Sequence, residues 1–103
     1  MLNRITATVW WMLADAHAKT AASEAKKAAR YLDPLYGVHR IRRAQDARVA
    51  AGFAAASAQD AMTYLNQDNY DAVVCAAEKA HHFLTQACQA AEDAAVNNEH
   101  LNQ

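Results

Sequence analysis

The residues with the clearest chemical potential are Cys75, Glu78, His81 and His82. In a helix, Glu78 and His81 have the Glu-x-x-His spacing that di-iron bundle proteins use, and Cys75, Glu78 and His82 share one face. A di-iron site also needs a second such pair and glutamates from two other helices, which the sequence does not supply. We therefore expect no metal site and no cofactor, with the cysteine in the helix packing and the histidines at its edge.

A second group of candidates lies in the stretch from Arg30 to Arg48, RYLDPLYGVHRIRRAQDAR, which we call the basic turn. It holds half of the ten Lys and Arg residues of the chain. Because the arginine fork matches both carboxylates and phosphates, the basic turn could contact acidic groups of a protein or, as the alternative, the phosphate backbone of a nucleic acid. In a third interpretation, Arg30, Arg40 and Arg43 act within the chain, where they pair with acidic residues such as Asp33 and Asp46 or coat a helix end.

Two adjacent tryptophans give the strongest indication of a partner. Trp10 and Trp11 project about 100° apart on a helix, so only Trp11 continues the apolar stripe described below. Trp10, with Leu13 one turn later, is left near the surface, and Trp, Tyr and Arg are the usual anchors of protein interfaces. The predicted partner-binding residues are Trp10, Leu13, Tyr36, His39, Arg40, Arg42 and Arg43.

Motifs typical of enzymes are missing from the sequence. It has no Gly-rich phosphate loop, no nucleophile elbow and no Cys-x-x-Cys pair. We therefore expect a protein that is not an enzyme.

Three long helices must position these candidates, over residues 2–32, 38–66 and 69–96, with a frayed tail at 97–103. Apolar residues alternate in steps of three and four along the first and third helices. Asp33, Pro34 and Gly37 end the first helix and begin a turn. The predicted fold is all-α, a single domain built as an antiparallel three-helix bundle of Ala-rich helices with coiled-coil-like heptad packing. The first predicted stripe is Ala7, Trp11, Ala14, Ala18, Ala21, Ala25, Ala28, Leu32 and Leu35, and the third is Tyr70, Val73, Ala77, Ala80, Leu84, Ala87, Ala91 and Ala94.

The middle helix keeps the same alternation of three and four residues, with one polar residue in it. Its predicted stripe is Ile41, Ala44, Arg48, Ala51, Ala55, Ala58, Met62 and Leu65. Arg48 interrupts the apolar residues, so it either extends to water or meets a carboxylate such as Glu24 or Glu78. Gly52 lies in the middle of this helix, where it predicts a close contact with a neighbouring helix.

Composition limits the size of the core. The chain has 103 residues, of which 27 are alanines. Alanine removes little apolar area from water, so the packing is thin and self-association, as a homodimer, is one expectation.

Charge and cysteine usage bear on location and partners. Residues 1–59 have a net charge of +5 and residues 60–103 a net charge of −6. Cys75 and Cys88 are separated by about 20 Å on one helix, too far for a disulfide, and are expected to be reduced core residues of a cytoplasmic protein. The apolar run ITATVWWMLA is too short to span a bilayer, so no membrane contact is expected.

These observations favour a small interaction protein. We expect it to occupy a surface on a larger protein or complex as an inhibitor, adaptor or assembly factor, and phages and other mobile elements are typical sources of such proteins. Nucleic-acid binding through the basic turn is the alternative function, and metal binding by the helical bundle is a further one.

Overall fold

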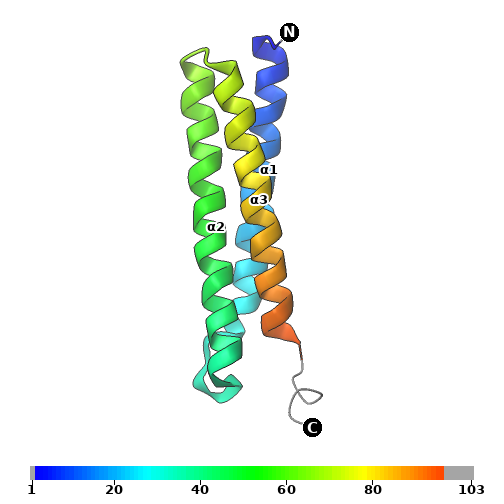
Figure 1. Cartoon of the computed structure of the whole chain (residues 1–103), viewed down its shortest axis with the longest axis vertical. Helices are drawn as coiled ribbons and strands as arrows, with labels where there is room; N and C mark the ends of the chain where they lie inside the picture. The colour runs from blue at the N-terminus through cyan, green and yellow to red at the C-terminus, as the bar shows by residue number, and fades with distance from the viewer. Residues whose placement is uncertain (1, 97–103) are drawn as a thin grey trace.

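Three long helices make up the computed structural model, which describes residues 2–96 (Figure 1). α1 spans Arg4–Ala28, α2 spans Gly37–Asn66 and α3 spans Tyr70–Ala95. Each helix packs against the other two, and the molecule measures 55 × 20 × 14 Å. The prediction of an all-helical fold is confirmed, and no strand occurs within residues 2–96. The expected tail at 97–103 lies outside the described residues.

The link between α1 and α2 consists of two short 3₁₀ segments, Ala29–Leu32 and Pro34–Tyr36. The Asp33 carboxylate accepts a hydrogen bond from the Leu35 amide at 2.9 Å, and Pro34 occupies the first position of the second segment, where its missing N–H costs nothing. Gly37 has a φ of 86°, a region that favours glycine. α2 begins at this residue.

Polar side chains begin α1 and α3. The Asn3 side chain accepts a hydrogen bond from the Thr6 amide at 2.9 Å, and the Asn69 side chain accepts one from the Ala72 amide at 3.4 Å. Such caps satisfy amide groups that have no partner within the helix. The polar turn after Asn66 therefore begins α3 at the place that the sequence indicated.

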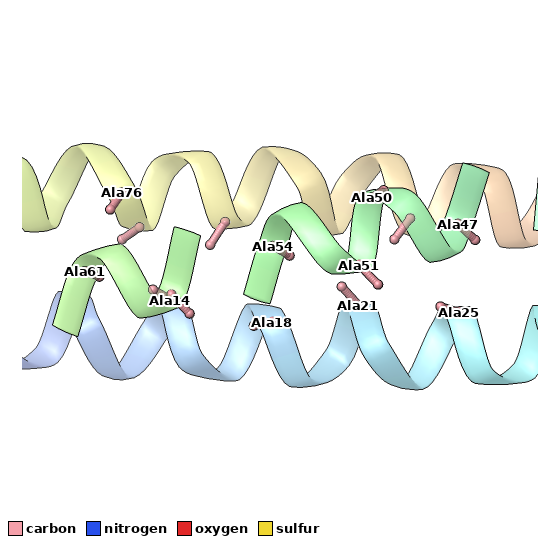
Figure 2. Packing of buried hydrophobic residues seen from close by; sticks show 14 of the residues in the cluster. Ala14, Ala18, Ala21, Ala25, Ala47, Ala50, Ala51, Ala54, Ala61 and Ala76 are labelled. Carbon is pink, nitrogen blue, oxygen red and sulfur yellow. The ribbon is translucent and has the colours of Figure 1, made fainter. Parts of the chain in front are cut away.

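The core between the helices is built almost entirely of alanine, and we call it the alanine seam. All but two of the buried apolar residues are alanines, the exceptions being Leu65 and Val73. Figure 2 shows Ala21 of α1 and Ala51 of α2 pointing toward one another. Small side chains allow helix axes to approach toward the short end of the usual range of about 8–10 Å. Half-buried large side chains, among them Trp10, Trp11, Tyr64 and Phe83, cover the edges of the seam.

The buried face of α2 differs from the predicted stripe. Arg48, Ala55 and Met62 are exposed, whereas Ala47, Ala54 and Ala61 are buried. Ala44, Ala51, Ala58 and Leu65 of the predicted stripe are buried, so this half of the prediction is correct. The other inward positions lie one residue earlier than predicted, which brings small side chains into the seam. Arg48 thus lies in water, and it has no ion pair with Glu24, Glu78 or any other residue within the described part of the chain.

Three further expectations are wrong. Leu35, predicted on the first stripe, is 89% exposed, because the 3₁₀ segments turn it outward. Cys75, predicted in the core, is exposed, and Cys88 is half-buried. Gly52 is exposed and has no neighbour within 4 Å of the place where a Cβ would stand, so it does not mark a close helix contact.

Candidate interaction surfaces

Arg40 of the basic turn is used inside the molecule. Its Nε donates a hydrogen bond to the carbonyl oxygen of Ala94 at 2.7 Å, and its Nη2 donates to that of Ala95 at 3.4 Å. The guanidinium group also lies over the rings of Tyr31 and Tyr36, at 4.5 and 5.0 Å from their centroids. Carbonyls at a helix end have no partner within the helix and attract cations. Arg40 therefore joins the end of α3 to the link between α1 and α2.

Arg43 is also engaged within the chain. It forms an ion pair with Asp46 of its own helix at 2.8 Å and one with Asp93 of α3 at 2.9 Å. The pairing with Asp46 agrees with the third interpretation of the basic turn. Tyr36 is half-buried and packs edge-on against Tyr31, with ring centroids 5.1 Å apart. Its ring is thus partly covered, which leaves less of it for stacking on a base.

The two remaining basic-turn candidates are free to meet a partner. His39 and Arg42 are exposed, and neither forms an ion pair or side-chain hydrogen bond in the described part of the chain. The four predicted partner-binding residues of the basic turn other than Tyr36 therefore fall into two pairs. Arg40 and Arg43 stabilise the bundle, whereas His39 and Arg42 project from it.

On α1, Trp10 is half-buried and packs against the alanine seam, while Leu13 is exposed. The structure also reveals a larger apolar surface around them that the sequence analysis missed. Ile5 is 79% exposed, and Val9 and Met12 are more than half exposed. With Ala16, which is also exposed, these residues follow one another in steps of three and four on the side of α1 away from the seam. We call Ile5, Val9, Met12 and Ala16 the outer stripe.

The outer stripe could have been found from the sequence, because its spacing is that of a second heptad phase on the same helix. The first phase, through Ala7 and Ala14, faces the seam. Apart from Trp10 and Trp11, which cover the edges of the seam, the bulky apolar residues of this half of α1 lie on the outside and the small ones inside. A surface helix that packs only inward has polar residues on its outer face, and the apolar outer stripe departs from this pattern.

A second exposed apolar surface lies between α2 and α3. The rings of Phe53 and Phe83 stack across the two helices with centroids 5.1 Å apart. Phe53 remains 53% exposed, and Val49, one turn earlier on α2, is 58% exposed. Shallow grooves flank the stacked pair on both sides along the rod.

The residues considered for metal binding do not come together. No group of three or more His, Cys, Asp or Glu side chains that could hold a metal ion occurs among residues 2–96. His81 instead contacts His17 of α1, with ring centroids 5.0 Å apart.

Burial lowers the pKa of His17, and the neighbouring His81 lowers it further. Burial, then the nearby Glu24 and Glu92 carboxylates, raise the pKa of the Cys88 thiol, which is the direction of an unreactive cysteine.

The fold and these surfaces define a small all-helical protein with a thin alanine core and large apolar side chains on its outside. No family model matches the sequence, and no curated protein and no solved structure is significantly similar to it. No helix within the described residues is long and apolar enough to cross a membrane.

Proposed function

We propose that this chain is a non-enzymatic interaction module that binds a larger protein or complex, as an inhibitor, adaptor or assembly factor. One observation supports this proposal most directly. The outer stripe exposes Ile5, Val9 and Met12 to water, although the same helix already uses its opposite face for packing. Water contact with such side chains is unfavourable, and removing each from water is worth about 1.5–3 kcal/mol. A partner that covers the stripe would gain this free energy.

We also propose that the three helices form an antiparallel bundle with coiled-coil-like heptad packing. This bundle acts as a rigid support for the outer stripe. Trp10 and Leu13 extend the apolar contact along one edge of the stripe. His39 supplies a polar contact near the other end of the rod.

Nucleic-acid binding through the basic turn has less support. Arg40 and Arg43 already have partners within the chain, so fewer cations remain for phosphates. A phosphate grip with so few free charges binds weakly and is sensitive to salt.

The proposal is tested by affinity purification from the native host, comparing three forms of the tagged full-length chain. These are the wild type, the double variant Val9→Glu with Met12→Glu, and the control Ser23→Glu, which changes an exposed residue at the same heptad position beyond the stripe. We expect a discrete protein to survive a high-salt wash with the wild type and with Ser23→Glu, and to be lost with the double variant.

Two results would contradict the proposal. A partner retained equally by the double variant would show that the outer stripe is not the contact surface. Nucleic acid alone, released by the high-salt wash and lost on changing Arg42→Glu, would favour the alternative. Circular dichroism of each variant checks that the helices are intact.

A further inference from the structure

The exposed surface between α2 and α3 has a symmetry that the outer stripe lacks. Along the outward side of α2, exposed residues follow one another in alternating steps of four and three: Arg42, Asp46, Val49, Phe53, Ala56 and Asp60. This spacing places them on one helix face. With Phe83 of α3, which stacks on Phe53, we call these residues the α2/α3 face.

The pattern is symmetric about residue 51. Val49 and Phe53 lie two positions on either side of it, Asp46 and Ala56 five, and Arg42 and Asp60 nine. The apolar pair is therefore central, with a cation about 13 Å away at one end and an anion about 13 Å away at the other, at 1.5 Å per residue. Placed against a second copy that runs in the opposite direction, Val49 meets Phe53 and Arg42 meets Asp60, each of them twice.

The charges at the two ends are available for such pairing. Neither Arg42 nor Asp60 forms an ion pair within residues 2–96, and both are exposed. Asp46, the remaining charge along this side of α2, is neutralised by Arg43 at 2.8 Å and would lie opposite the small Ala56. The antiparallel arrangement therefore brings no like charges of these residues together.

We infer that the α2/α3 face binds a second copy of this chain, in an antiparallel dimer with two-fold symmetry. In this dimer Val49 and Phe53 pack around the axis, and Arg42 of each copy pairs with Asp60 of the other. A two-fold interface requires that one surface be complementary to itself, and the charges along this face meet that requirement. Since each helix packs on the other two, the groove between α2 and α3 faces away from α1, so the outer stripe stays free for another partner. The dimer does not depend on the proposed function.

Reversing the charge of Arg42 or Asp60 tests this pairing, because in a homodimer each substitution changes both ion pairs at once. Arg42→Asp alone brings two carboxylates together at both ends of the interface, and Asp60→Arg alone brings two arginines together at both ends. In an equimolar mixture, however, each variant complements the other at both contacts. The control is Arg48→Asp, which reverses an exposed cation on the same helix but off the α2/α3 face.

Sedimentation equilibrium of the full chain over a wide concentration range gives the dimer dissociation constant. We expect each single variant to weaken the dimer by at least about tenfold, because like charges at an interface are repulsive, while the mixture and Arg48→Asp behave like the wild type. Phe53→Ser should weaken it as well. A wild-type chain that stays monomeric at every concentration would overturn the inference. So would a dimer insensitive to both reversals, a mixture that does not recover, or a dimer lost on changing Val9→Glu instead.

Discussion

Arg40 of α2 donates a hydrogen bond from its Nε to the carbonyl oxygen of Ala94 at 2.7 Å, so the first turns of α2 hold the last turn of α3. The same guanidinium group lies over Tyr31 and Tyr36. An arginine that resembles a binding residue in the sequence is thus a structural clamp at one end of the rod.

Replacing this clamp should destabilise the protein. Arg40→Ala removes a charged hydrogen-bond donor and leaves carbonyl groups of α3 without a partner, so we expect a loss of about 2 kcal/mol in the free energy of unfolding. Arg42→Ala, two residues away and exposed, should change it by less than about 0.5 kcal/mol. Urea denaturation followed by circular dichroism measures both, and equal losses would argue against the clamp.

The corrected seam of α2 can be tested with two neighbouring alanines. Ala54 is fully buried, whereas Ala55 is exposed. Ala54→Leu inserts bulk where helices meet and should cost about 1–3 kcal/mol or more, while Ala55→Leu should be nearly neutral. Thermal unfolding of the two variants distinguishes them. If Ala55→Leu were instead the more destabilising change, Ala55 rather than Ala54 would face the seam, as the predicted stripe had it.

The two glycines should respond in opposite directions to alanine. Gly52 lies in open helical surface with room for a Cβ, so Gly52→Ala should stabilise the chain by up to about 1 kcal/mol through helix propensity. Gly37 has a φ of 86°, which strains any residue with a Cβ, so Gly37→Ala should destabilise by about 1 kcal/mol. Chemical denaturation measures both changes, and a destabilised Gly52→Ala variant would indicate that a contact covers this position.

His17 should make stability depend on pH. Its pKa is lowered in the folded state by burial and by His81, so below about pH 6.5 the unfolded chain takes up a proton that the folded chain resists. Stability is therefore lost as the pH falls below that value, and is unaffected by this group at higher pH. His17→Gln should reduce the drop in melting temperature between neutral and mildly acid pH. An unchanged drop would assign it to other groups.

Sequence periodicity predicted the inner faces of α1 and α3 because alanines alternate there with polar residues. For α2 it identified Ala44, Ala51, Ala58 and Leu65 but missed Ala47, Ala54 and Ala61, because alanines occupy several faces of this helix at once. Since the alanines offer no contrast in size, the bulky Ile41 and Met62 shift the predicted stripe to one side of the buried face. Burial shows Met62 exposed and Ile41 only half-buried.

Some contacts of the candidate surfaces could be predicted from the sequence and others could not. The pairing of Arg43 with Asp46 follows from spacing along one helix. Its second partner, Asp93, and the Ala94 carbonyl bound by Arg40 depend on how α3 is placed along α2, which no local pattern determines. The outer stripe has a recognisable spacing in the sequence, but the adjacent tryptophans are the more prominent signal, and they indicate a neighbouring face.

The alanine seam places few demands on the sequence of the core. Alanine has no side-chain rotamers to order, and its packing requires only that the side chain stay small. The positions that hold the helices together and those of the proposed contact surfaces are therefore largely separate. Substitutions at Val9 or Arg42 would change the proposed contact surfaces without disturbing how the helices meet. The chain is in this sense a scaffold whose specificity is free to diverge while its architecture stays fixed.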